Sequence, residues 1–215
     1  MKQKTVLLAT AALLLLIFAS ATLIYKRSQA AAAVQLAAQH STHLVRSHSP
    51  TLGAEDATVL IVEFFDPACG TCQAFHVPLQ HLIQKHPGKL KLVLRWAPFQ
   101  VGSEQIVALL EAARRQDKLW PVLDVLMETQ DDWKPQHAAE LDLAWKHLAG
   151  LGLDLERLRR DMADPEIAAR IKQDEDDAAQ LKVDTTPTFY VNGKPLPGFG
   201  FSVLKQTVEA ALHGS

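Results

Sequence analysis

The chain contains two cysteines, Cys69 and Cys72, and together they form one Cys-x-x-Cys sequence. Two thiols at this spacing can close and open a disulfide by thiol–disulfide exchange. They cannot staple a scaffold with several disulfides, and they cannot fill a four-ligand structural zinc site. The pair therefore predicts a redox centre in which Cys69 is the exposed nucleophile and Cys72 is the more buried, resolving thiol.

Other interpretations of the cysteine pair stay open at this point. A structural disulfide would close too short a loop to stabilise the fold much, and two core cysteines would have no chemistry. Copper or zinc could instead be bound by Cys69, Cys72 and His76, which lies one helical turn after Cys72. A metal-binding or metal-delivery protein is thus the second hypothesis, and a non-catalytic adaptor for protein binding is the third.

Two further residues could serve exchange chemistry. Glu63 is an acid within an apolar run, six residues before Cys69. Burial would raise its pKa, so that it could accept the proton of Cys72; the alternative is a surface acid at a strand end. Pro187 lacks an N–H, which suits a cis peptide bond and a free carbonyl at Thr186 where a substrate strand could pair. The alternative is an ordinary turn proline.

The elements around the cysteines must place them at a strand-to-helix junction. A continuous apolar run over 58–65 predicts a buried strand, helical spacing over 70–86 predicts a helix, and 89–96 predicts a second strand. A crossover of about 20 residues makes these strands parallel. Unpaired N–H groups and the dipole at the helix start would stabilise a thiolate at Cys69, whereas Gly70 and Thr71 add no cation.

Residues 103–182 show only helical periods, and a strand at 188–192, an Asn192-Gly193 turn, a strand at 194–196 and a helix at 201–212 follow. This order predicts an α/β, thioredoxin-like fold with an all-helical insertion at about 103–182, within a domain spanning 44–215. The acidic run 174–177 is expected to be a solvated helix face and not a metal site.

The first 27 residues form a separate segment. An uncharged run over 5–25 lies between basic residues and is long enough to span a bilayer, so 1–27 is predicted to be a signal anchor with a transmembrane helix at 5–25. Ala19-Ser20-Ala21 leaves a cleaved signal peptide as the alternative. An Ala-rich spacer follows at 28–43. The chain after residue 27 has 18 cations and 24 acids, a charge of −6, which disfavours nucleic acid as a partner.

The chain resembles the DsbA-like family of exported thiol–disulfide oxidoreductases from about residue 47 to 212. The resemblance is carried by four motifs: Leu52-Gly53 with Ala57-Thr58-Val59; Val62-Glu63-Phe64-Phe65-Asp66-Pro67-x-Cys69-x-x-Cys72; Glu111-Ala112-Ala113 with Gln116-Asp117-Lys118-Leu119-Trp120; and Thr186-Pro187-Thr188-Phe189 with Val191-Asn192-Gly193-Lys194.

The resemblance implies Cys69 as nucleophile, Cys72 as resolving thiol, Glu63 as buried acid and Pro187 in cis, with Thr186, Gly70 and Thr71 beside the substrate. It implies no cofactor beyond the cysteines. Its partners would be exported proteins and a membrane redox protein that resets the pair. The catalytic domain would lie in the periplasm, on a single-pass anchor in the inner membrane or, after cleavage, as a soluble protein.

The sequence between the cysteines departs from that family. Many relatives carry Pro-His or Pro-Tyr there, whereas this chain has Gly70-Thr71. A histidine at this place favours the reduced thiolate, so its absence predicts a weaker oxidant. Thr186 before the proline is similar to isomerases and reductases as well as to some oxidases. The oxidase direction is favoured, with the reductase and isomerase directions left open.

Overall fold

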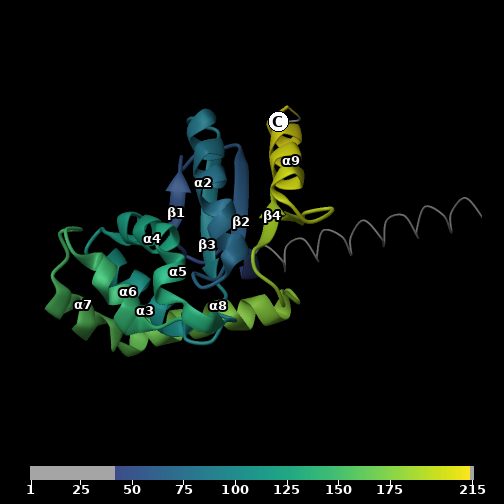
Figure 1. The fold of residues 1–215 in the computed structure, drawn as a ribbon. Helices are drawn as coiled ribbons and strands as arrows, with labels where there is room; N and C mark the ends of the chain where they lie inside the picture. The colour runs from purple at the N-terminus through teal and green to yellow at the C-terminus, as the bar shows by residue number, and fades with distance from the viewer. Residues whose placement is uncertain (1–41, 214–215) are drawn as a thin grey trace, which may run out of the picture. The chain divides into compact units, whose positions relative to one another are not determined.

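The computed structural model describes residues 42–213 of the chain (Figure 1). The predicted anchor 1–27 and nearly all of the spacer 28–43 lie outside these residues, so both stay predictions. Within residues 42–213, no helix is both long enough and apolar enough to span a membrane.

A parallel pair of strands forms the centre of the sheet. β2 (Val59–Phe65) and β3 (Leu90–Trp96) run parallel in register from the Val59–Leu90 pair to the Phe65–Trp96 pair. Helix α2 (Gly70–Lys85) makes the crossover between them and continues through Pro78. The apolar runs and the helical spacing of the sequence predicted this unit, and the structure confirms it.

Three shorter strands complete the five-stranded sheet, whose order is β1-β3-β2-β4-β5. β4 (Thr188–Val191) pairs antiparallel with β2 and with β5 (Lys194–Pro195). Asn192 and Gly193, which join the two, have φ values of 48° and 77°, as a tight hairpin turn requires. β1 (Thr51–Gly53) was not predicted, because three residues are too few to show a strand period.

The helical insertion gathers at the end of the sheet where α2 begins (Figure 1). The region predicted to be helical, 103–182, holds α3 (Ser103–Arg114), α4 (Leu119–Glu128), α5 (Gln130–Trp133), α6 (Leu141–Trp145), α7 (Leu155–Met162) and α8 (Pro165–Gln180). Helix α6 is short, because the chain tightens into a 3₁₀ turn at Lys146–Leu148. Helix α9 (Phe201–His213) ends the described chain.

The two faces of the sheet pack against different elements. Side chains alternate along β2, so Val59, Ile61 and Phe65 belong to the core that also contains α2, α9 and most of the insertion. Val62 and Phe64 belong to a second core with the end of α8. Glu63 follows the alternation of Ile61 and Phe65 and therefore lies on the α2 face.

The prediction of a solvated acidic face at 174–177 is wrong for two of its four residues. Asp174 and Asp177 are fully buried on α8, whereas Asp176 between them is exposed. The buried arginine of β3, Arg95, donates to Asp174 at 2.8 Å and to Asp177 at 2.6 Å. Two acids three residues apart share one side of a helix, and that side turns towards the sheet.

The N-terminal part of the described chain joins this charged cluster. Arg46 donates to both carboxylate oxygens of Asp177, His43 lies 2.7 Å from the same carboxylate, and His48 lies 2.8 Å from Asp174. Burial disfavours the charged form of Asp177, but hydrogen bonds from Arg46, His43 and Arg95 outweigh it and lower the pKa of this carboxyl. His43, at the end of the predicted spacer, and His48 are therefore structural partners of α8.

Candidate active site around the dithiol

The two cysteines occupy the junction between β2 and α2, as the sequence predicted. Cys69 is the extended residue that precedes α2, and Cys72 lies in its first turn. The loop before them is fixed by Asp66, a fully buried carboxylate that accepts hydrogen bonds from the N–H groups of Ala68 and Gln100, each at 2.8 Å, and from the Ser103 hydroxyl. The sequence predicted no role for Asp66 in the site.

The cysteines differ in accessibility, although less than predicted. Cys69 was expected to be exposed, but only 9% of it is accessible, because the Thr186 loop packs against its sulfur. Cys72 is completely buried. Both are free thiols, and the Sγ atom of Cys69 lies 3.2 Å from the carbonyl oxygen of Thr186. Cys69 is thus the more accessible of the two sulfurs.

The surroundings give the two thiols opposite acidities. Hydrogen bonds from the side chains of Cys72 and Thr186 and from the N–H groups of Cys72 and Thr71 lower the pKa of Cys69 to about 5, against the effect of burial. The pKa of Cys72 is raised, first by burial and then by the neighbouring Cys69 and the Glu63 carboxylate. At neutral pH the thiolate is therefore the accessible sulfur.

Glu63 is buried beneath the dithiol, with 3% of its surface accessible, so the alternative of a surface acid is wrong. Its cross-strand neighbours are Leu94 on β3 and Phe189 on β4, and its Oε1 atom has no hydrogen-bond partner. Burial raises the pKa of Glu63 strongly, and the charge of Cys69 raises it further. Burial of this kind favours the protonated form of the carboxyl.

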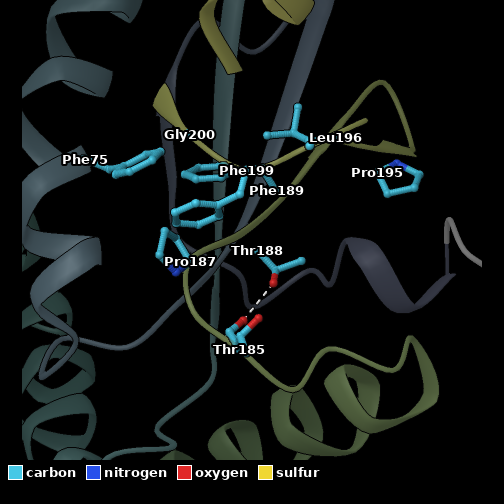
Figure 2. A pocket seen from close by; sticks show the side chains of 10 residues that line it. Phe75, Thr185, Pro187, Thr188, Phe189, Pro195, Leu196, Phe199 and Gly200 are labelled. Atoms are coloured by element: carbon cyan, nitrogen blue, oxygen red, sulfur yellow. Dashed lines mark hydrogen bonds between the residues drawn. The ribbon is translucent and has the colours of Figure 1, made fainter. Parts of the chain in front are cut away.

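An apolar pocket of about 140 Å³ adjoins Pro187, whose peptide bond with Thr186 is cis. Figure 2 shows Phe75 of α2, Phe189 of β4 and Phe199 around it. The rings of Phe75 and Phe189 stack at 5.6 Å, while 72% of Phe199 is exposed. Phe75 and Phe189 lie at apolar positions of a predicted helix and a predicted strand, where core residues are expected. The sequence therefore did not predict the pocket.

Gln130 of α5 reaches the loop that carries Cys69, and sequence reasoning missed it. Its completely buried side chain donates from Nε2 to the carbonyl oxygens of Pro67 at 2.7 Å and Cys69 at 3.1 Å. Its Oε1 atom accepts a hydrogen bond from Lys134 Nζ at 3.1 Å. The insertion therefore helps to shape the dithiol site. Gly70, which was predicted to line the substrate site, is exposed at the start of α2.

The alternative metal site is not formed. His76 Nε2 lies 2.7 Å from a carboxylate oxygen of Asp124 on α4 and also contacts Gln80. Across residues 42–213, no three histidine, cysteine or carboxylate side chains gather as metal ligands would. The alternative hypothesis, in which His76 completes a site with Cys69 and Cys72, is therefore wrong, because His76 is held on the α4 side of α2.

Comparisons with known proteins agree with this architecture. A family model described as thioredoxin matches residues 46–209. The Na(+)/H(+) antiporter NhaA of Herminiimonas arsenicoxydans is 32% identical over 163 residues, which cover 76% of this chain but 25% of the antiporter. The chain thus spans about a quarter of such relatives.

Two further relatives match over most of their own length. Disulfide bond formation protein D of Bacillus subtilis is 27% identical over 172 residues, covering 77% of this chain and 78% of that protein. A crystal structure of a thioredoxin-like oxidoreductase from Silicibacter pomeroyi shares 30% identity at a TM-score of 0.67, covering 79% of this chain and 95% of that one. The chain belongs to the thioredoxin family, in its branch of DsbA-like thiol–disulfide oxidoreductases.

Proposed function

We propose that the chain exchanges disulfides with exported proteins through Cys69 and Cys72, with the oxidase direction favoured. One observation carries the proposal: the accessible Cys69 has a pKa of about 5, whereas the buried Cys72 has a raised one. A low pKa makes Cys69 a good leaving group, and it stabilises the reduced protein, which raises the reduction potential.

In the oxidase direction, the chemistry begins with the Cys69–Cys72 disulfide. A substrate thiolate attacks the Cys69 sulfur, so a substrate–Cys69 bond forms and the electron pair of the broken bond goes to Cys72. A second substrate thiolate then attacks the substrate sulfur, and Cys69 leaves as the thiolate. Two electrons pass to the protein, and the substrate leaves as a disulfide. A redox partner in the membrane removes these electrons and restores the pair.

Glu63 donates a proton to the buried Cys72 sulfur and accepts a proton from it. When Cys72 is released as a thiolate in an apolar core, its charge is unfavourable, and the protonated Glu63 can neutralise it. In the reverse reaction the Glu63 carboxylate takes the Cys72 proton, so that Cys72 can attack. The burial of Glu63, which raises its pKa, suits it to both steps.

The substrate segment lies against Thr186 and Pro187. The Thr186 carbonyl already faces the Cys69 sulfur, and an extended segment bonded to Cys69 can pair with this backbone by β-augmentation. An apolar side chain of the same segment fits the pocket that Phe75, Phe189 and Phe199 form. The remaining sequence proposals, a periplasmic location and an inner-membrane anchor at 5–25, match a role on exported proteins.

The decisive test is the trapping of substrates by a Cys72→Ala variant in the cell that makes the protein. Without a resolving thiol, mixed disulfides through Cys69 should accumulate and disappear on reduction, and a Cys69→Ala/Cys72→Ala variant should trap none. Absence of any mixed disulfide would overturn the proposal. The reduction potential then assigns direction, since a value near −270 mV would indicate a reductase and one approaching −120 mV an oxidase.

A further inference from the structure

A lysine of the insertion lies beside the residue that follows the nucleophile. Lys134 Nζ is 3.7 Å from the position that a Cβ atom on Gly70 would occupy, and Gln130 Oε1 is 3.8 Å from the same point. Because Gly70 has no side chain, this space next to Cys69 is open to the lysine. The uncharged Gly70-Thr71 dipeptide is thus accompanied by a cation from a segment more than 60 residues away.

Gln130 fixes the place of this cation. Its two N–H donors are directed at the carbonyl oxygens of Pro67 and Cys69, so its oxygen is turned the other way, towards Lys134 Nζ. Because the amide is completely buried, its orientation is set by these three bonds. The loop of the nucleophile and the ammonium group are therefore held by one side chain.

The charge of Lys134 is available to a second molecule. Lys134 is half-buried, and within residues 42–213 it makes no ion pair. The acids of α5, the helix that ends just before Lys134, are Asp131 and Asp132; both are exposed, and Asp132 approaches His147 at 3.7 Å. An ammonium group without a carboxylate partner, next to the residue that follows Cys69, can attract a carboxylate that a substrate brings.

We propose that Lys134 is a specificity-determining residue of the dithiol site, favouring substrates with an Asp or Glu beside the reacting cysteine. This inference rests on the proposed exchange activity. The substrate cysteine is bonded to Cys69 in the mixed disulfide, so its flanking residues come close to residue 70. A carboxylate there is attracted to Lys134 in the encounter complex and in the transition state, whereas a lysine is repelled.

The test uses two peptides of equal length, each closed by an intramolecular disulfide, with either Glu or Lys flanking both cysteines. In the reduced protein the Cys69 thiolate attacks one peptide sulfur, and the other peptide sulfur leaves as a thiolate. Cys72 then attacks Cys69, so the protein disulfide forms and the peptide leaves as a dithiol. The rate constant for each peptide is divided by its rate with dithiothreitol, which removes the intrinsic reactivity of the peptide.

The wild-type protein should prefer the Glu peptide about 5-fold at low salt, and the preference should approach unity at about 1 M salt, where charges are screened within a few ångström. Lys134→Met should abolish the preference, and Lys134→Glu should invert it. The matched control is Lys118→Met, since Lys118 is also half-buried and its Nζ also lies beside a glycine, 3.5 Å from the Cβ position of Gly152. This variant should keep the 5-fold preference.

The outcomes separate this inference from the proposed function. Equal rates for the two peptides with the wild-type protein, or an unchanged preference in Lys134→Met, would overturn the role of Lys134 while leaving disulfide exchange in place. No reaction of the wild-type protein with either peptide, under conditions in which dithiothreitol reacts with both, would instead overturn the proposed function.

Discussion

The Cys69 sulfur lies 3.2 Å from the carbonyl oxygen of Thr186, although 117 positions separate the two residues along the chain. Cys69 comes from the loop after β2, and Thr186 comes from the segment that enters β4 after the entire helical insertion. The backbone carbonyl that faces the Cys69 sulfur is thus placed by the antiparallel pairing of β2 with β4. The sheet itself therefore holds the proposed nucleophile beside the backbone that is proposed to pair with a substrate.

The acidity of Cys69 gives the first prediction. Its thiolate, followed by absorbance near 240 nm in the reduced protein, should titrate with a midpoint near pH 5. The rate of attack on a disulfide should be constant above about pH 6 and fall below pH 5, because the thiolate is the nucleophile. Cys72→Ala should raise the midpoint, since the largest stabilising hydrogen bond comes from Cys72. A midpoint near the usual value of about 8.5 would contradict this account.

Replacement of Glu63 gives the second prediction. Glu63→Gln keeps the shape of the side chain but carries no proton for the buried thiol, so the decay of the mixed disulfide should slow by about 100-fold. The exposed Glu104 provides the control, as Glu104→Gln should decay at the wild-type rate. Quench-flow measurement of the mixed disulfide separates this step from the attack by Cys69, which should change little.

The same variant should alter how stability depends on pH. The folded protein retains the Glu63 proton at pH values where the unfolded chain, with a glutamate pKa of about 4.3, has released it. This contribution therefore lowers the free energy of unfolding as pH rises above about 4.3, up to the raised pKa of the folded state. Urea denaturation between pH 4 and 8 should show this decline in the wild type, and a shallower one in Glu63→Gln.

The third prediction concerns the apolar pocket beside Pro187. Phe199 is largely exposed on its rim, so Phe199→Ser should leave the thermal midpoint nearly unchanged. It should raise the KM for a peptide with an apolar residue next to its cysteine by about 10-fold, the loss expected from part of an aromatic side chain. Val101→Ser is the control, because Val101 is 75% exposed and does not line the pocket. Equal KM values for the two variants would show that the pocket does not bind the apolar residue of the peptide.

The fourth prediction concerns the charged cluster on the other face of the sheet. Arg95→Met leaves Asp174 and Asp177 buried with fewer partners, which should destabilise the protein by about 3–5 kcal/mol. Arg160→Met, at an exposed position of α7, should cost little. Urea denaturation at pH 7 measures both, and similar losses in the two variants would show that the buried cluster adds nothing to stability.

The lowered pKa of Asp177 also determines how the stability of the protein changes as pH falls. Its pKa is lowered in the folded state, so its contribution to stability is complete above the unfolded value of about 3.9 and is lost as pH falls further. Asp177→Asn should therefore be less stable than the wild type at pH 7, and the difference should shrink between pH 4 and 2. A constant difference across this range would mean that the charge of Asp177 is not involved.

Local patterns in the sequence were sufficient for the centre of the fold. The apolar run of β2, the helical spacing of α2 and the Asn192-Gly193 turn each reflect short-range rules, and the structure has them where expected. The helical periods over 103–182, set between the strands, predicted the insertion and its place in the chain. The positions of Cys69 and Cys72 followed from the same junction.

Contacts between distant segments were not predictable in this way. The spacing of Asp174 and Asp177 suits a buried helix side, but only the presence of Arg95 opposite them distinguishes that from a solvated one. Gln130 and Lys134 lie in a polar stretch of the insertion that resembles any surface segment. Their relation to Gly70 and Cys69 depends on how α5 packs on the core, which no local period encodes.

The charged cluster and the dithiol lie on opposite faces of one sheet. Arg95 follows the alternation of Val93 and packs beside Phe64, whereas Glu63 and Cys72 belong to the α2 face. The single layer of strands thus separates two sets of ionisable groups, one on each face of the sheet. Protein engineers can change tolerance to acid by redesigning the neighbours of Arg95, and leave the tuning of the cysteines untouched.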